Sequence, residues 1–348
     1  MPTAYDLTRE QLTDLLVRWG EPVFRAKQVW NQLWKRAATY EQMSEISPAL
    51  RERLTAELPL GLEVMDERTA DHGATRKALL KVGGRHLIEV VLMGYPDRVT
   101  VCVSSQAGCA MGCGFCATGQ MGLLGNLTAG EIAAQVLWAR REAAALPDTT
   151  PRRLTNVVFM GMGEPLANER HVFDSLDLLT GPAGIGARHV TVSTVGIVPG
   201  IERLAGRVPQ VGLAVSLHAA TDELRDELVP PNTRYPLARL EAAIAGWRDA
   251  TRRRPSIEWA MIAGTNDTDE QARALAPIAR RLGAHVNLIP LNPTPGSPAQ
   301  PSSQRRIHGF VRVLRAAGVN VTVRDTRGRR IDAACGQLAL SAGAASVG

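Results

Sequence analysis

The stretch "VTVCVSSQAGCAMGCGFCATG" (residues 99–119) decides the fold, because an apolar run ends there in a loop rich in glycine and cysteine. Its first six residues predict a strand that is buried on both faces. The stretch "TAGEIAAQVLWARR" (residues 128–141) follows and predicts a helix that opens with a capping box of Thr128 and Glu131. The next apolar run, "NVVFMG" (residues 156–161), predicts a second strand. Strand, helix and strand in this order predict a parallel α/β sheet.

The same alternation continues along the chain and predicts an incomplete, TIM-type (βα)6 barrel. Further strand-like runs lie at residues 189–194, 211–218, 257–262 and 286–291, which makes six in all. A polar or glycine-rich cluster follows each of these runs. Ligands of such barrels bind at the C-terminal ends of the strands, so we expect these clusters to converge on one mouth.

The first part of the chain predicts a small helical domain instead. Apolar residues recur at helical spacing in "FRAKQVWNQLW" (residues 24–34), and "SPALRERL" (residues 47–54) opens with Ser47 as an N-cap. We therefore divide the chain into a helical accessory domain at 1–74 and a barrel domain at 75–348, which begins with a β-hairpin. A basic helical face in the first domain could hold RNA phosphates, although a solvated charged face explains it equally well.

Composition predicts a cytoplasmic globular protein that does not contact membranes. The chain has 348 residues, 45% of them hydrophobic, and no apolar stretch approaches the roughly 20 residues that cross a bilayer. Four of its five cysteines lie within residues 102–116, which favours metal binding in a reducing compartment over a disulfide framework. The formal net charge of +6 favours an anionic partner, but many proteins that bind no nucleic acid are as basic.

The cysteine loop predicts a metal site with an open position. Cys109, Cys113 and Cys116 are spaced C-x3-C-x2-C, unlike the C-x2-C pairs of zinc ribbons or the C-x2-C-x2-C run of ferredoxins. Three thiolates can hold three irons of a cubane cluster, and the fourth iron is then free for a ligand. A zinc knuckle is the alternative interpretation of the same cysteines.

The cysteine spacing, with Phe115 before the last cysteine, resembles the signature of radical S-adenosylmethionine (SAM) enzymes. "GMGEP" (residues 161–165) is similar to the "GGE" type motif of that superfamily, and its glutamate can bind an ammonium group. The resemblance implies a barrel of the radical SAM kind and a 4Fe–4S cluster held by the three cysteines. It also implies that SAM binds the open iron and is cleaved to a 5′-deoxyadenosyl radical.

Motifs over nearly the whole chain resemble the RlmN and Cfr family of RNA methyltransferases. They are "FRAKQVWNQLW", "GCAMGCGFCATG", "FMGMGEPLAN", "VSTVGIVP", "SLHA", "LNPTPG" and "IDAACGQL". The resemblance implies two SAM molecules per turnover: one methylates a cysteine of the protein, and the radical from the other takes hydrogen from that methyl group. The carbon then joins an adenine, and a second cysteine resolves the protein–RNA crosslink by forming a disulfide. Adenine C2 is electron-poor and does not attack a sulfonium methyl, so a carbon radical is needed there.

Matched motif by motif, the resemblance makes Cys335 the methylated cysteine, Cys102 the resolving cysteine and Glu89 the proton acceptor. The residues matched to the SAM pocket are Gly163, Glu164, Ser193, Ser216, Leu217, His218 and Asn292. Each of three residues also has a structural interpretation without a functional role. His218 could be a hydrogen-bonded turn residue, Glu89 a solvated strand-edge residue and Cys335 a small core residue. The chain departs from the family at Gly125, where a basic residue is common, and this puts a local contact with RNA phosphate in doubt.

Two activities of the family compete, methylation of adenine at C2 and at C8, and the motifs do not separate them. We favour C2 of an adenine in 23S ribosomal RNA, and also in transfer RNA, as the housekeeping activity; the C8 reaction confers antibiotic resistance. An electron carrier or RNA-binding iron–sulfur protein without catalysis would leave Cys102 and Cys335 without a role. The expected partners are RNA and an electron donor such as flavodoxin or ferredoxin, and the expected state is a monomer.

Overall fold

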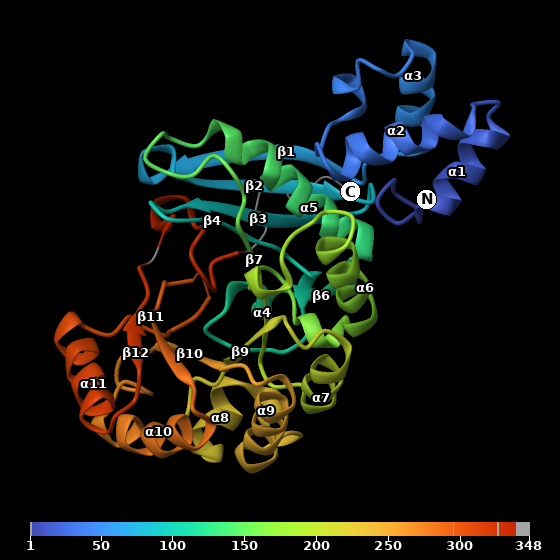
Figure 1. The fold of residues 1–348 in the computed structure, drawn as a ribbon. Coiled ribbons are helices and arrows are strands. Elements are labelled where there is room, and N and C mark those ends of the chain that lie inside the picture. The colour runs from blue at the N-terminus through green and yellow to red at the C-terminus, as the bar shows by residue number, and fades with distance from the viewer. Residues whose placement is uncertain (1, 295, 326, 339–348) are drawn as a thin grey trace.

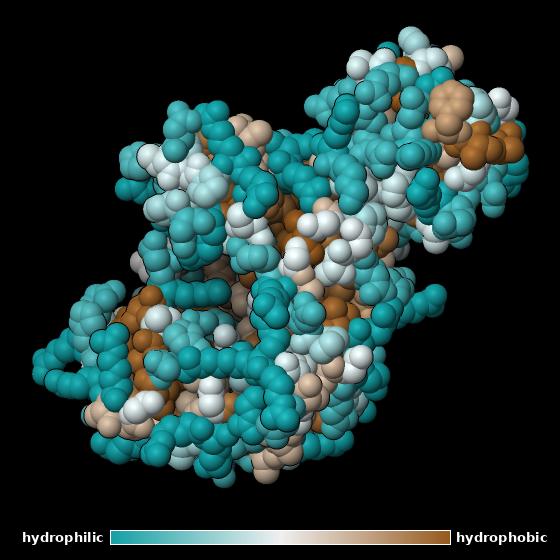
Figure 2. All heavy atoms as spheres, in the orientation of Figure 1, coloured by the Kyte–Doolittle hydropathy of each residue, from teal (hydrophilic) through white to brown (hydrophobic). Residues whose placement is uncertain are grey.

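The computed structural model describes residues 2–294, 296–325 and 327–338, and it separates a small helical lobe from a larger body built on one curved sheet (Figure 1). The lobe contains α1 (Arg9–Arg18), α2 (Val23–Trp34) and α3 (Pro48–Glu57). The Ser47 hydroxyl accepts a hydrogen bond from the Leu50 amide at 3.3 Å, so the predicted N-cap of α3 is confirmed. Figure 2 shows a hydrophobic patch on the lobe, and the exposed Val17, Val23 and Phe24 belong to its α1–α2 end.

The sheet of the body has ten strands among the described residues. In spatial order they are β1 (Leu62–Ala70), β2 (Thr75–Val82), β3 (His86–Gly94), β4 (Val99–Cys102), β7 (Asn156–Phe159), β8 (Val190–Thr194), β9 (Gly212–Ser216), β10 (Ser256–Met261), β11 (His285–Pro290) and β12 (Val321–Val323). All six predicted barrel strands are present as β4 and β7 to β11, and they run parallel. The short strand β12, parallel to β11, was not predicted.

Helices cover the outside of the parallel strands, as an incomplete (βα)6 barrel requires (Figure 1). They are α5 (Ala129–Glu142), α6 (Glu169–Thr180), α7 (Val198–Arg207), α8 (Asp222–Leu228), α9 (Leu237–Thr251), α10 (Asp269–Leu282) and α11 (Gln304–Ala316). The predicted capping box of α5 is confirmed, because Thr128 accepts from the Glu131 amide and the Glu131 carboxylate accepts from the Thr128 amide. The sheet remains open between its edge strands β1 and β12.

The hairpin that precedes the barrel has one strand more than predicted. Strands β2 and β3 pair antiparallel, and the turn between them contains Gly83 (φ 56°) and Gly84 (φ 71°), as tight hairpin turns require. Strand β1 pairs antiparallel with β2, so residues 62–70 belong to the sheet although the sequence placed them with the helical domain. The helices of the lobe end at Glu57, before β1 begins. The domain division at residue 74 stays a prediction.

No helix in the described part of the chain is long and apolar enough to cross a membrane.

Candidate functional site

The cysteine loop lies between two short strands and a single helical turn. Cys109 ends β5 (Gln106–Cys109), which pairs with β6 (Gly122–Asn126), and Cys116 immediately precedes α4 (Ala117–Gln120). Cys109 and Cys113 are buried, Cys116 is half-buried, and all three are free thiols. Gly108 has a φ of 71°, and a Cβ atom there would collide with the backbone of β6, so only glycine lets the loop fold back this tightly.

The three thiols come from one loop and are the type of ligand that an iron–sulfur cluster uses. Burial raises the pKa of Cys109 to about 11 and raises that of Cys113 further, so metal binding would have to release their protons. No three histidine, cysteine or acidic side chains of the described residues are placed to hold one ion. A cubane cluster bonds each thiolate to a different iron, and its ligands therefore stand further apart than those of one zinc ion.

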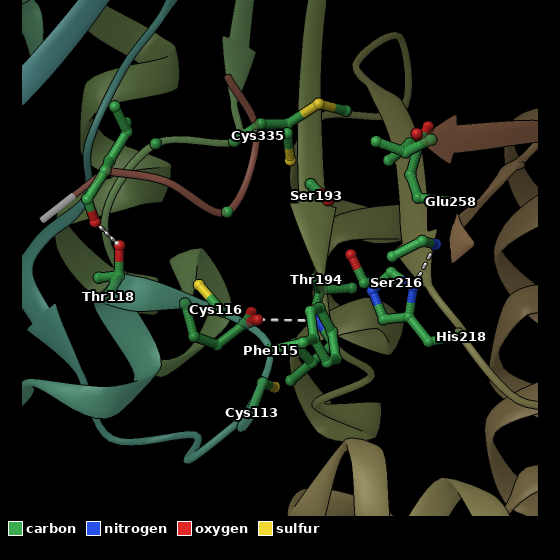
Figure 3. A pocket seen from close by; sticks show the side chains of 18 of the residues that line it. Cys113, Phe115, Cys116, Thr118, Ser193, Thr194, Ser216, His218, Glu258 and Cys335 are labelled. Atoms are coloured by element: carbon green, nitrogen blue, oxygen red, sulfur yellow. Dashed lines mark hydrogen bonds between the residues drawn. The ribbon is translucent and has the colours of Figure 1, made fainter. Parts of the chain in front are cut away.

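A cavity opens beside Cys113 and Cys116, at the C-terminal ends of the parallel strands (Figure 3). The predicted SAM-pocket residues that line this cavity are Gly163, Glu164, Ser193, Ser216, His218 and Asn292. Leu217 is the exception: its side chain is buried elsewhere, and its amide donates to the Glu258 carbonyl. The structure thus brings the clusters after five of the six strands together at one mouth, whereas the cluster after β10 (residues 264–267) does not line this cavity.

Glu164 lies in this cavity wall with both carboxylate oxygens engaged by backbone. Oε1 accepts from the Leu166 amide at 2.9 Å and Oε2 from the Val195 amide at 2.8 Å, which joins the β7 loop to the β8 loop. Burial raises the pKa of Glu164 to about 7, although these two hydrogen bonds oppose the shift. Gly163 has a φ of 99°, and a Cβ atom there would meet the Gln106 side chain, so glycine is required next to this carboxylate.

The imidazole ring of His218 is neutral, and its hydrogen bond to the backbone shows which ring nitrogen carries the proton. Its Nδ1 lies 3.0 Å from the Ala260 amide, which can only donate, so the proton must be on Nε2. Burial and the nearby Arg225 lower the pKa of His218 to about 3. The edge of its ring packs against Phe115 of the cysteine loop, with centroids 4.9 Å apart (Figure 3). His218 is therefore both a hydrogen-bonded turn residue and part of the cavity wall.

The sequence analysis missed two buried charged residues: Glu258, which lines the cavity, and Arg225, which binds the loops beside it. Arg225 is buried, and its guanidinium donates to the carbonyls of Leu217 (3.0 Å) and Val195 (2.5 Å) and to Asn232 Oδ1 (2.7 Å). It lies in "TDELRDEL" (residues 221–228), whose many charged residues are typical of an exposed helix. The local sequence therefore did not indicate that Arg225 is buried. Glu258 is a buried carboxylate within the apolar run "SIEWAM" (residues 256–261), and it belongs to none of the motifs that carry the family resemblance.

The segment that carries Cys335 crosses the cavity. Its backbone carbonyl groups accept three hydrogen bonds, two from side chains and one from a backbone amide. The Asn292 amide group donates to the Cys335 carbonyl at 3.2 Å, and the Ala117 amide donates to the Gly336 carbonyl at 2.8 Å. Thr118 donates to the Leu338 carbonyl at 2.5 Å (Figure 3). The cysteine loop and the C-terminal segment are thereby fastened together, and the Cys335 side chain is accessible from the cavity although protein surrounds it.

Cys335 also lines a second cavity, and Cys102 lies in the wall of that one. Burial raises the pKa of Cys102 to about 12 and that of Cys335 to about 11, and Arg324 opposes both shifts. Both thiols are therefore protonated at neutral pH. The structure brings together two cysteines that are far apart in sequence and sets Cys335 between the two cavities.

Glu89 is buried and lines neither cavity. Its Oε1 accepts from Lys77 Nζ at 2.8 Å, and the same ammonium group donates to the Asp332 carbonyl at 3.2 Å, just before Cys335. Val91 of β3 pairs with Cys102 of β4, so Glu89, two residues earlier, lies on the same face of the sheet as Cys102. A solvated strand-edge position is therefore wrong for Glu89, and its role as proton acceptor stays a prediction.

Gly125, the departure from the family pattern, has a steric cause in this chain. It lies on β6, and a Cβ atom at this position would run into the imidazole ring of His86. A larger basic side chain is therefore incompatible with His86 in its present place.

Comparisons with known proteins agree with this geometry. Residues 103–276 match the family model described as radical SAM superfamily, and residues 4–59 match that of the ribosomal RNA large subunit methyltransferase N-terminal domain. A probable dual-specificity RNA methyltransferase RlmN of Chloroflexus aurantiacus is 49% identical, over 96% of this chain and 92% of that protein. The protein with the same description from Salinispora tropica is 51% identical, over 97% and 92%. A crystal structure of a radical SAM methyltransferase from Sphaerobacter thermophilus superposes with a TM-score of 0.91 at 47% identity, covering 97% of this chain and 99% of that one.

Proposed function

The chain belongs to the RlmN family of radical SAM RNA methyltransferases, and on this premise we propose that it methylates C2 of a specific adenine in 23S ribosomal RNA and in transfer RNA. The observation that carries the proposal is the position of Cys335, which lines the cavity beside the cysteine loop and also the cavity that contains Cys102. One residue can therefore meet SAM from one side and an adenine from the other.

The residues of the first cavity suit the two groups that the superfamily uses. When bound, a 4Fe–4S cluster held by Cys109, Cys113 and Cys116 and two SAM molecules per turnover supply a methyl group and a hydrogen-abstracting radical. Gly163, Glu164, Ser193, Ser216, His218 and Asn292 would contact SAM, with Leu217 packed behind them. Asn292 also holds the Cys335 carbonyl, which keeps the methyl acceptor beside the SAM residues.

Cys335 carries the transferred carbon. Its thiol loses a proton and gains the methyl group at Sγ. The methyl group then loses a hydrogen atom to the radical, its carbon bonds to C2 of the adenine, and the adduct gives up one electron, which the cluster, when bound, would accept, so that Cys335 links protein and RNA. Because burial raises the pKa of Cys335 to about 11, proton loss needs help, and the positive charge of Arg324 favours it.

Cys102 and Glu89 separate the product from the protein. The Cys102 sulfur attacks Cys335 Sγ, an S–S bond forms and the bond from Sγ to the transferred carbon breaks. Glu89 takes the proton from C2, and the released carbon gains a proton to become the methyl group. The shared cavity of the two cysteines and the position of Glu89 on the Cys102 face of the sheet support this division of roles.

The remaining assignments follow from the same proposal. We assign RNA binding to the helical lobe within residues 1–74 and catalysis to the body of residues 75–348, whose sheet β1 (Leu62–Ala70) extends. The RNA substrates place the reaction in the cytoplasm, a reduced flavodoxin or ferredoxin would supply the electron, and a monomer suffices because both cysteines come from one chain.

The product of the reconstituted enzyme tests the proposed function. Protein loaded with iron and sulfide without oxygen, reduced, and supplied with SAM and either 23S ribosomal RNA or transfer RNA should yield 2-methyladenosine on nucleoside mass spectrometry. 8-Methyladenosine would move the chain to the Cfr activity, and the absence of any methyladenosine would overturn the proposal.

A variant pair tests the roles of the two cysteines in the same assay. Cys102→Ala should still methylate Cys335 but should accumulate a protein–RNA crosslink, because nothing then breaks the bond to Sγ. Cys335→Ala is the matched control and should form no crosslink. Normal turnover by Cys102→Ala would exclude it as the resolving residue.

A further inference from the structure

The second cavity has an arginine–tyrosine cluster (Tyr95, Arg98 and Arg327) in its wall, beside both cysteines. The Arg98 guanidinium carbon lies 4.1 Å from the centroid of the Tyr95 ring, and that of Arg327 lies 5.1 Å from it. Guanidinium groups already pack on this ring, so a nucleobase would find it occupied. The cluster therefore offers positive charge rather than an aromatic surface for stacking.

The cluster joins the two pieces of chain that carry the catalytic cysteines. Tyr95 and Arg98 begin and end the turn between β3 and β4, closed by a hydrogen bond of 2.8 Å from the Tyr95 amide to the Arg98 carbonyl. Cys102 ends the strand that follows this turn. Arg327 lies on the C-terminal segment that leads to Cys335. Whatever the cluster binds is thereby held at a set place relative to both thiols.

Arginines outnumber carboxylates in the wall of this cavity, although Arg324 also lies 3.9 Å from the buried Glu258 carboxylate. Three arginines line it, and Asp325 is the one carboxylate among its described lining residues. Asp325 pairs with Arg327 at 3.2 Å, and Asp97 pairs with Arg98 at 3.0 Å. The side chains of Asp325 and Asp97 are 75% and 72% exposed. Exposed ion pairs of this kind contribute little free energy, so an incoming anion can replace these carboxylates as the partner of the arginines.

We propose that the arginine–tyrosine cluster binds a phosphodiester group of the substrate RNA next to the target adenine. This inference rests on the proposed function, because it is the adenine at Cys335 that brings an RNA backbone into the second cavity. Guanidinium groups match phosphate oxygens with paired hydrogen bonds, and a backbone contact sets the register of a nucleotide without reading its base. The cluster would thus position the adenine for either RNA substrate.

RNA binding by the full-length protein tests the cluster directly. Fluorescence anisotropy with labelled total transfer RNA, repeated over a series of salt concentrations, measures both affinity and the number of phosphates neutralised. Arg98→Gln and Arg327→Gln should each weaken binding about tenfold, and each should reduce the slope of log Kd against log salt by about one. Arg98→Lys keeps the charge and should restore the slope while recovering only part of the affinity.

Arg281→Gln is the matched control, because Arg281 is an exposed, ion-paired arginine on α10, away from the cavity. It should leave both affinity and slope at wild-type values. An unchanged salt slope in Arg98→Gln and Arg327→Gln would overturn the inference, and a lower unfolding midpoint with that result would mark the cluster as purely structural. A wild-type enzyme that fails to make methyladenosine would instead count against the proposed function, whatever the salt slopes of the variants.

Discussion

His218 illustrates how a single residue serves the backbone and the cavity together. Its φ of 59° places it in the left-handed region, which an uncommon few non-glycine residues occupy, and this turns the chain sharply at the end of β9. The turn directs the ring so that Nδ1 accepts from the Ala260 amide of the next strand, which leaves Nε2 as a donor. The sequence motif "SLHA" pointed to this residue, but only the structure assigns its proton.

The buried, neutral His218 should make the protein sensitive to acid. Its pKa is lowered to about 3, while an unfolded chain has the ordinary value of about 6.5, so the unfolded state binds the extra proton between these pH values. Stability is therefore fully present above pH 6.5 and is lost as the pH falls, by about 1.4 kcal/mol per unit. The raised pKa of Glu164 acts in the opposite direction over the same range, so the His218 contribution is measured as the difference in urea unfolding between pH 7 and pH 5 in the wild type and in a variant without the imidazole.

His218→Asn should remove the His218 contribution, so that the variant loses less stability than the wild type, or gains some, between pH 7 and pH 5; asparagine tolerates the left-handed backbone and does not titrate. His189→Gln changes an exposed histidine and serves as the control, with the pH dependence retained. Equal pH dependence in all three proteins would contradict the assignment.

At the level of secondary-structure elements, two buried charged side chains connect the loops that follow neighbouring strands. Arg225 of α8 binds carbonyl groups in the loops after β8 and β9, and Glu164 joins the loops after β7 and β8. The loops at the mouth are thus connected by buried charged groups rather than by sheet hydrogen bonds. This arrangement keeps in place the cavity residues that lie on loops.

Arg225→Met should loosen the mouth and lower the free energy of unfolding by about 3 kcal/mol, because buried carbonyl groups and Asn232 would lose a charged donor. Arg225→Lys should recover little, since one ammonium group cannot reach all partners of the planar fork. Arg305→Met, an exposed arginine, should change stability by less than about 0.5 kcal/mol in the same urea titration. A loss no larger in Arg225→Met than in this control would contradict the role of the buried guanidinium.

At the scale of the whole molecule, α5 connects the helical lobe to the body. Arg141 donates to the Ala37 carbonyl at 2.8 Å, and Arg140 donates to the carbonyls of Trp34 at 2.9 Å and Ala183 at 2.6 Å. The lobe is thereby fixed to the helix that follows the cysteine loop. If the lobe binds RNA, its position relative to the second cavity depends on these contacts.

Arg141→Met should release the lobe without disturbing the barrel. Loss of one charged hydrogen bond of about 1.5 kcal/mol should speed hydrogen exchange of amides in α1 to α3 roughly tenfold. Amides of β7 to β11 should keep their exchange rates. Arg152→Met, at an exposed ion pair, should alter neither set, and uniform acceleration over the chain would show global destabilisation instead.

The order of the six barrel strands, the caps of α3 and α5 and the three-cysteine loop could be predicted from the sequence, because periodicity, capping and motif spacing act between residues close in the chain. It could not place strand β1, whose partner β2 is selected by pairing across the sheet, nor the buried charges of Arg225 and Glu258, whose partners come from other loops. Only the tertiary structure decided that Cys335 separates two cavities and shares one of them with Cys102. Cys102 and Cys335 lie far apart in the sequence of the barrel domain, and packing of the whole sheet brings them to the same cavity.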